Sequence, residues 1–408
     1  MTIAGQVSKL GPGALDEAGI REHIWPLFSR VLRRNEIYLA NHSLGRPLDR
    51  VADDIREGLD LWFERMDGAW DEDGWPAEIE RFRVAVARLI GLNDPKAVIP
   101  KTSAGQGLRA ALNAIPKDRV TVVATRGEFD SVDFILKTYM SKGRADVRWV
   151  EPRTEADSVP LVEADDVLAA IGCGVDLVIV SAILFSTGQI MPRLPEIVAE
   201  ARRAGALVLV DAYHAVGVVP VDMMAIDCDF IVGGSYKYTR GGPGACWLAV
   251  HPRVLESGLR TLDTGWFAKR DPFSYLRPEE PEAAEGGDAW LESTPPVLTM
   301  YQARAGLEFT VAIGVERLRR YGLEQLRVLR AAFSERGVPC HQPGSPEAFG
   351  GFALVPHADA PNLCRKLLRA GVNTDSRGGN VRFGPDLLNT RSELVEAAAR
   401  TARVLADG

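Results

Sequence analysis

Short apolar runs alternate with amphipathic segments through the middle of the chain. The apolar runs lie at 97–99, 120–124, 147–150, 177–181, 207–210, 230–232 and 246–250. The intervening helical patterns include 77–90, 131–140 and 194–204. This alternation is typical of βαβ units, so we expect an α/β fold with a mostly parallel seven-stranded sheet and ligands at the carboxyl ends of its strands.

The pattern differs on both sides of this region. Before it we expect a helix at 15–31, a strand at 37–40 and a helix at 48–66. After it we expect helices at 296–319 and 323–336, then strands at 352–355, 371–374 and 381–383 with helices at 360–368 and 391–405. The predicted domains are an N-terminal segment (1–60) that packs with the small domain, a large domain (61–295), and a linking helix with a smaller α/β C-terminal domain (296–408).

Composition narrows the function classes. The 408 residues are 46% hydrophobic and 25% charged, with a net charge of −7, which is typical of a globular protein and argues against nucleic-acid or anionic membrane partners. We expect a cytoplasmic protein, since no secretory pattern and no long apolar stretch is present. The five cysteines are scattered without a CxxC pair, which favours reduced thiols, and nothing suggests a metal.

Two neighbouring strands are each followed by one ionisable group. The run 207–210 ends at Asp211, and the run 230–232 leads through two glycines to Lys237. A lysine amine and a buried carboxylate suit pyridoxal 5'-phosphate (PLP): the amine forms a Schiff base with the cofactor, and the carboxylate keeps the pyridine nitrogen protonated. A surface lysine and an ordinary strand-end aspartate are the alternative, but the surrounding glycines favour close approach to a ligand.

These motifs resemble those of a known family. Asp211-Ala212-Tyr213-His214-Ala215-Val216-Gly217, Ser235-Tyr236-Lys237-Tyr238 and Gly242-Pro243-Gly244 are similar to kynureninase and its relatives among the class V, fold-type I PLP enzymes. Cysteine desulfurases and class V transaminases usually carry Gln at the position of His214 and His at that of Tyr236. The resemblance runs from about Ile37 to the C-terminus. It implies the fold-type I PLP-dependent transferase fold and a homodimer with sites at the subunit interface.

The resemblance also implies a set of cofactor contacts. Thr102 and Ser103 match the phosphate loop, where a helix N-terminus attracts an anion, although the motif by itself favours simple N-capping. Phe129 matches the ring that stacks on the pyridine, and the family's nearby aspartate falls at Val132 unless the loop shifts. His214 is expected to orient Asp211 or to touch the cofactor ring.

Substrate contacts are implied on two other segments. Arg382, in Val-Arg-Phe-Gly-Pro, matches the arginine that grips the substrate α-carboxylate, and its planar fork suits that task. Arg377 is a weaker candidate. His42 and Ser43 lie in a loop that borders the substrate site in the family, with His42 where Asn is usual.

A long loop at 259–296 is rich in Pro, Gly, acidic and aromatic residues, so we expect it to be functional or disordered. Trp266 matches a tryptophan that reaches a neighbouring subunit's phosphate in the family. Phe267 matches a phenylalanine that lines the substrate pocket, and Thr294 matches a position at the cofactor site. Kynureninase has His at the position of Lys269 and Asn at that of Thr294. Arg240, just past Lys237, is a candidate contact for the phosphate or a neighbouring subunit, although the expectation is an exposed loop arginine.

Together these residues predict a PLP-dependent enzyme acting on an amino acid. Lys237 would remove the α-proton, Asp211 would stabilise the pyridinium, and Tyr236 would bind phosphate and relay a proton. The resemblance implies kynureninase-like hydrolytic Cβ–Cγ cleavage of L-kynurenine or a related β-acyl alanine, giving alanine plus an acid. A class V aminotransferase or a β- or γ-lyase, including a cysteine desulfurase, stays open. A non-enzymatic PLP-fold protein predicts loss of Lys237 or Asp211, and both are present.

Overall fold

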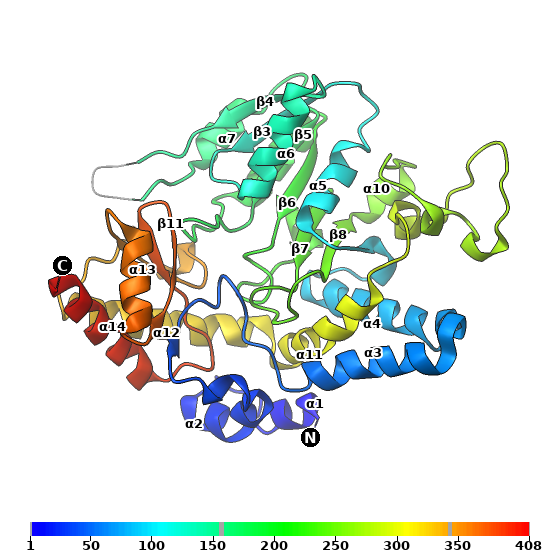
Figure 1. Cartoon of the computed structure of the whole chain (residues 1–408). Coiled ribbons are helices and arrows are strands. Elements are labelled where there is room, and N and C mark those ends of the chain that lie inside the picture. The colour runs from blue at the N-terminus through cyan, green and yellow to red at the C-terminus, as the bar shows by residue number, and fades with distance from the viewer. Residues whose placement is uncertain (1, 155–158, 342–344, 408) are drawn as a thin grey trace.

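A seven-stranded sheet forms the centre of the molecule (Figure 1). The computed structural model describes residues 2–154, 159–341 and 345–407. The strand order is β2-β8-β7-β6-β5-β3-β4, and every pairing is parallel except the two made by β8. The strands are β2 (Val98–Lys101), β3 (Val120–Thr125), β4 (Ala145–Val150), β5 (Leu177–Ser181), β6 (Leu207–Asp211), β7 (Phe230–Gly234) and β8 (Cys246–Val250). The predicted α/β fold with a mostly parallel sheet is confirmed.

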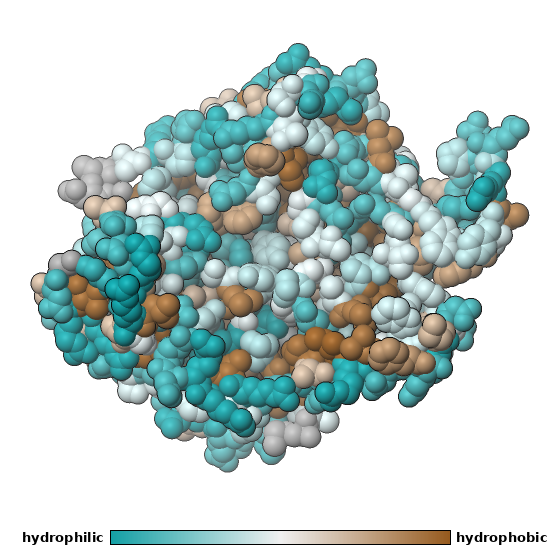
Figure 2. All heavy atoms as spheres, viewed as in Figure 1, coloured by the Kyte–Doolittle hydropathy of each residue, from teal (hydrophilic) through white to brown (hydrophobic). Residues whose placement is uncertain are grey.

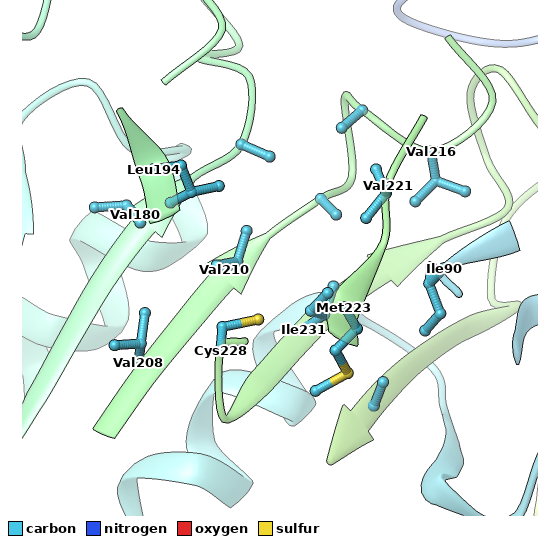
Figure 3. Packing of buried hydrophobic residues seen from close by; sticks show 14 of the residues in the cluster. Ile90, Val180, Leu194, Val208, Val210, Val216, Val221, Met223, Cys228 and Ile231 are labelled. Atoms are coloured by element: carbon cyan, nitrogen blue, oxygen red, sulfur yellow. The ribbon is translucent and has the colours of Figure 1, made fainter. Parts of the chain in front are cut away.

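Helices cover both faces of this sheet. They are α4 (Trp75–Leu89), α5 (Ala104–Leu112), α6 (Asp130–Ser141), α7 (Ala164–Ala170), α8 (Leu194–Arg203), α9 (Met223–Ile226) and α10 (Pro252–Glu256). Alternate strand residues enter opposite cores: Val208 and Val210 pack into one cluster, shown in Figure 3, and Leu209 into the other. Strands buried on both faces must be apolar throughout, which is why the sequence located them well.

The N-terminal region departs from the expected single helix at 15–31. A short helix α1 (Ile3–Ser8) is followed by α2 (Glu17–Gly19), a π-helical turn (Ile20–Ile24) and 3₁₀ turns at Trp25–Phe28 and Val31–Arg33. Pro26 lacks a backbone N–H and disfavours an uninterrupted α-helix here, so the prediction of one helix is wrong. The apolar side chains of this region pack with Phe309 and Leu387 in one cluster. The next elements are β1 (Ile37–Tyr38) and α3 (Val51–Arg65).

The C-terminal region is a smaller α/β unit joined through two long helices. These are α11 (Val297–Ile313) and α12 (Val315–Ser334), and they meet at Gly314, whose φ of 87° breaks the helix. The predicted end near Arg319 is therefore wrong. The unit contains β9 (Ala353–Pro356), α13 (Ala360–Arg369), β10 (Val372–Asn373), β11 (Asp375–Arg377), β12 (Asn380–Phe383) and α14 (Arg391–Ala406). The sequence had not predicted β11.

The N-terminal segment pairs with this smaller unit. Strand β1 lies parallel to β10, while β11, β12 and β9 form a separate antiparallel sheet. The division of the chain at residues 60 and 295 stays a prediction. In the part of the chain that the structure describes, no helix is long and apolar enough to cross a membrane.

Residues 257–296 form a long connecting segment, here called the arm, whose outer part projects from the body of the molecule at the right of Figure 1, while Ala289, Trp290 and Leu291 near its end are buried in the core. Its 3₁₀ turns are Trp266–Ala268, Pro272–Ser274 and Gly286–Trp290, and others in the chain lie at Met66–Trp70, Pro95–Ala97 and Pro346–Ala348. Trp70 packs on Phe267 of the arm with ring centroids 5.2 Å apart. The face in Figure 2 is largely hydrophilic, with a band of hydrophobic residues over α11.

Gly45 joins the N-terminal loop to the segment that carries Lys237. Its N–H donates to the Tyr236 carbonyl at 3.1 Å, and a Cβ added to it would lie 1.8 Å from the Lys237 carbonyl oxygen. We expect Gly45→Ala to lower the free energy of unfolding by about 3 kcal/mol, because backbone cannot yield as a flexible side chain does. Gly322→Ala is the matched control: Gly322 lies in α12 with no atom near the added Cβ, and should gain about 0.5 kcal/mol. Equal melting temperatures for the two variants would contradict this account.

Candidate functional site

A cavity of about 520 Å³ opens at the carboxyl ends of β5, β6 and β7 and extends to the smaller unit. Parallel sheets bind ligands at this edge, and the volume lies in the range of small-molecule sites. Its lining brings together residues from segments far apart in the chain. Ten of the predicted site residues line it: His42, Ser43, Thr102, Ser103, Phe129, Asp211, His214, Tyr236, Lys237 and Arg382.

Lys237 lines this cavity. The Nζ atom lies 2.5 Å from His214 Nε2 and 4.8 Å from the centroid of the Tyr213 ring. Loss of hydration lowers the pKa of Lys237 to about 7, and the positive charge of Arg382 acts in the same direction. A substantial fraction of the amine is therefore neutral near pH 7, which is the form that acts as a nucleophile or a base.

Asp211 stands at the end of β6, on the wall of the same cavity. Its Oδ1 atom accepts a hydrogen bond from the Tyr213 N–H at 2.8 Å. Burial raises the pKa of Asp211, while that hydrogen bond and the Lys237 charge lower it. The carboxylate is thus a buried acceptor whose ionised form a nearby cation would stabilise.

His214 contacts the lysine amine. Burial holds the pKa of His214 well below its ordinary value, and the neighbouring Lys237 charge adds to this effect. The imidazole is therefore neutral, and its buried Nδ1 atom has no hydrogen-bond partner in the part of the chain that the structure describes. His214 lines the cavity and its Nε2 atom contacts the Lys237 amine, while its expected role, to orient Asp211 or to touch the cofactor ring, stays a prediction.

Glu128 is a buried carboxyl group to which sequence reasoning gave no role. It accepts hydrogen bonds from Thr125 Oγ1 at 2.8 Å and from Ser181 Oγ at 2.5 Å. Ser181 is the register partner of Asp211 in the neighbouring strand. Burial raises the pKa of Glu128 to about 7, and the negative charge of Asp211 contributes. The sequence signal that could have identified Glu128 was its position as a charged residue soon after an apolar strand.

The first turn of α5 forms another wall. The Ser103 hydroxyl caps the helix by accepting from Gln106 N at 3.2 Å, and the Thr102 N–H donates to Gln106 Oε1 at 2.7 Å. N-capping, the alternative explanation of these residues, is therefore realised. It leaves both residues exposed at the cavity, where the helix N-terminus favours an anion.

Arg382 is fully buried and paired. Its Nε and Nη2 atoms donate to the two oxygens of Asp375, at 2.7 and 2.5 Å, and Nη1 donates to the Phe185 carbonyl. Sequence reasoning missed Asp375. The signal was Arg377-Gly378-Gly379-Asn380, a two-residue hairpin turn that places Asp375 opposite Arg382. Arg377, the weaker candidate, also lines the cavity.

Three predicted residues do not line the cavity of their own chain. Trp266 and Phe267 belong to the aromatic cluster of the arm, where Trp266 Nε1 donates to the Pro272 carbonyl at 2.5 Å. Thr294 is exposed. Their roles stay predictions.

Arg240 corrects an expectation. It is buried, with 4% of its surface exposed and a φ of 58°, and its Nη2 atom lies 2.8 Å from Asp386 Oδ2. The expectation of an exposed loop arginine is wrong, because Asp386 provides a buried charge partner. Arg240 fixes the backbone just past Lys237 to the smaller unit.

The site suits PLP on several independent observations. It offers a lysine with a lowered pKa, a buried carboxyl group and a helix N-terminus around one cavity. The buried Ser235 Oγ atom, like His214 Nδ1, has no hydrogen-bond partner within the described residues, so a ligand has polar atoms to satisfy. Across the described residues, no group of three or more His, Cys, Asp or Glu side chains is placed to hold a metal ion.

The comparisons with known proteins agree with this site. The aminotransferase class-V family model matches residues 74–339, so the chain belongs to that family of PLP-dependent enzymes. The predicted family, fold type and cofactor are confirmed. Within the family, the chain is similar to the kynureninase of Bacillus anthracis, at 26% identity over 92% of this chain and 90% of the relative. It is 29% identical to the kynureninase of Burkholderia pseudomallei, over 91% and 89% of the two chains.

Solved structures share the fold. A C-DES variant with glycine covalently linked to its PLP cofactor has a TM-score of 0.81 at 19% identity, covering 92% of this chain and 98% of that one. The cysteine desulfurase of Thermococcus onnurineus has a TM-score of 0.77 at 16% identity, covering 91% and 95%. These similarities place the chain in the fold-type I architecture.

Glu128 makes stability depend on pH. Its folded pKa of about 7 exceeds the ordinary 4.5, so its stabilising effect is present below pH 4.5 and is lost as the pH rises through 7. We expect Glu128→Gln to abolish this loss, worth about 3 kcal/mol, so the variant should gain stability relative to wild type between pH 5 and 7.5. Urea unfolding at pH 5 and at pH 7.5 measures the free energy of unfolding of both proteins. Glu64→Gln, at an exposed position of α3, is the control, and parallel pH profiles for all three proteins would refute the assignment.

Proposed function

We propose that this protein is a kynureninase-like hydrolase that cleaves the Cβ–Cγ bond of L-kynurenine or a related β-acyl alanine, giving alanine and an acid. The observation that carries the proposal is that the Lys237 amine, with its pKa lowered to about 7, lines one cavity together with Asp211 and Arg382. Kynureninase relatives that span about nine-tenths of the chain support this choice of reaction.

When bound, PLP supplies an electron-withdrawing ring that stabilises negative charge at the substrate α-carbon. Lys237 would hold the cofactor and, once displaced by the substrate amine, take the α-proton on Nζ. Asp211 would accept a hydrogen bond from the protonated pyridine nitrogen. His214, neutral and 2.5 Å from Nζ, would keep that amine oriented.

Other side chains would fix the position of the cofactor and the substrate. Thr102 and Ser103 would bind the phosphate at the start of α5, and Phe129 would cover the ring. Tyr236 would bind phosphate and pass a proton to the β-carbon.

The substrate contacts would come from two segments. Arg382 would bind the α-carboxylate, with His42 and Ser43 beside it.

We also propose a cytoplasmic homodimer. Trp266, Phe267 and Thr294 lie away from their own cavity, so in this arrangement they would complete the site of the neighbouring subunit, with Trp266 and Thr294 at the cofactor and Phe267 at the substrate.

An aminotransferase or a lyase would use the same cofactor residues. A cysteine desulfurase would also need a reactive thiolate at the substrate. Cys246 lines the cavity, but it is buried beside Tyr213, and burial raises the pKa of its thiol. A thiol of this kind is a poor nucleophile at neutral pH, which disfavours the desulfurase alternative.

The absorption spectrum of the holoprotein tests the proposal. We expect a visible cofactor band that is absent from Lys237→Ala, and release of alanine plus an anthranilate when L-kynurenine or 3-hydroxy-L-kynurenine is added. Lys101→Ala is a matched control, because Lys101 is buried but pairs with Glu292 outside the cavity lining, and it should keep the band. A band without alanine release would exclude kynureninase chemistry. Conversion of the band to a stable pyridoxamine form would identify an aminotransferase.

The lowered pKa of Lys237 predicts a pH dependence for cofactor capture. Only the neutral amine attacks the aldehyde, so the rate at which apoprotein binds PLP covalently should rise with pH through about 7 and then level off. Asp211→Asn removes a charge that raises the pKa of Lys237 and should move the midpoint lower. Stopped-flow absorbance measures both rates. A midpoint near 10 in the wild type would show that Lys237 is not desolvated.

A further inference from the structure

Arg382 is the cation expected to bind a substrate carboxylate, yet most of its hydrogen-bonding capacity is already used. A guanidinium group has five N–H donors. Three of them are donated within the protein: Nε and Nη2 to Asp375, and Nη1 to the carbonyl of Phe185. The two that remain are one on Nη1 and one on Nη2. The remaining Nη2 donor lies at the end of the fork, because Asp375 occupies the edge that Nη2 shares with Nε.

The hairpin of β11 and β12 imposes this pairing. Asp375 and Arg382 are direct cross-strand partners, joined through a two-residue turn at Gly378 and Gly379. Side chains directly opposite each other on antiparallel strands lie close together and on the same face. The arginine therefore meets its carboxylate whether or not a ligand is present.

A third residue, from the other end of the sequence, holds the carboxylate. His42 is completely buried, and its Nε2 atom lies 2.7 Å from Asp375 Oδ1. Because a carboxylate only accepts hydrogen bonds, Nε2 carries the proton. The imidazole packs at 4.7 Å from the Phe352 ring, over which the Arg382 Cζ atom also lies at 5.3 Å.

The backbone is shaped to admit this imidazole. A Cβ atom on Gly384 would lie 2.3 Å from His42 Nδ1, so only glycine at this position leaves room for the ring. The adjacent Asn41 side chain donates to the Gly384 carbonyl at 2.9 Å and fixes the loop to the end of β12. His42 is thus held from several sides.

We propose that Asp375 and His42 are positioning residues that lock Arg382 with only its Nη1–Nη2 end free for a ligand, so that the site selects a carboxylate by geometry. The inference rests on the proposed function, in which Arg382 binds the α-carboxylate. A free guanidinium can pair with a carboxylate through either of two edges, and Asp375 blocks the Nε–Nη2 edge. The ligand carboxylate is held in one plane and one orientation.

Charge supports the same conclusion. The Asp375 carboxylate offsets the positive charge of Arg382, so the pair attracts anions weakly at long range. Arg377, whose Nη1 lies 3.8 Å from Asp375 Oδ2, is half exposed at the cavity. Discrimination at Arg382 itself must come from two parallel hydrogen bonds, which a carboxylate accepts and a neutral amide does not.

The test compares L-alanine with L-alaninamide, which keeps the amine and lacks the carboxylate. Dissociation constants come from the change in the visible spectrum of the holoenzyme. We expect wild type to prefer alanine and Asp375→Asn to reduce this preference about tenfold, since one charge-assisted hydrogen bond contributes on that order. Arg382→Ala should also lose the preference, and adding Asp375→Asn to it should change nothing further. Additive losses in the double variant would overturn the proposal.

Controls separate positioning from general destabilisation. Asp386→Asn alters another buried aspartate, paired with Arg46 and Arg240 away from the cavity, and should lower thermal stability without changing the preference. His42→Gln retains an N–H near the Nε2 position and should keep the preference within about threefold, whereas His42→Leu should lose it. These two variants also decide the question if Asp375→Asn does not fold.

The outcomes are distinct. A wild type that prefers alanine, with His42→Leu and Asp375→Asn unchanged, overturns the positioning role and leaves the proposed function standing. A wild-type spectrum that responds to neither compound overturns both.

Discussion

Removal of the Lys237 amine from water is the constraint on which the rest of the site depends. A buried ammonium group loses its hydration, which lowers its pKa, and for Lys237 the net result is a pKa of about 7. Here Asp211 compensates only in part, Arg382 opposes it, and the nearest polar atom is the neutral His214 imidazole. The fold therefore keeps a reactive, partly neutral amine, because burial and the charge of Arg382 disfavour the ammonium form more than Asp211 favours it.

Rigid surroundings make that balance possible. Strands β6 and β7 deliver Asp211 and the Lys237 segment side by side, and Gly45 and Arg240 tie that segment to the N-terminal loop and the smaller unit. Asp386 joins Arg240 to Arg46, so a buried carboxylate links three parts of the chain. The backbone on both sides of Lys237 is therefore held by contacts with other parts of the chain.

The sequence predicted what depends on burial and on local motifs. The central strands are continuous apolar runs, so their positions and the residues at their ends, Asp211 and Lys237, followed directly. It did not predict β11, because a three-residue strand of Asp, Ser and Arg has no hydrophobic signal. Asp375 and the buried state of Arg240 depend on partners distant in sequence, which periodicity does not report. The broken helix near Pro26 shows a proline interrupting an otherwise helical pattern.

The two arginine clusters illustrate how similar chemistry serves different ends. Asp386 pairs with Arg46 and Arg240 in the protein interior, so these ion pairs hold the backbone segments of the three residues together. Asp375 pairs with an arginine that lines the cavity, so in the proposed arrangement the same kind of ion pair orients the guanidinium for a ligand. Both aspartates have lowered pKa values, for Asp386 because of Arg46 and Arg240 and for Asp375 because of His42 and Arg382. Position relative to the cavity, rather than the strength of the ion pair, decides which one shapes recognition.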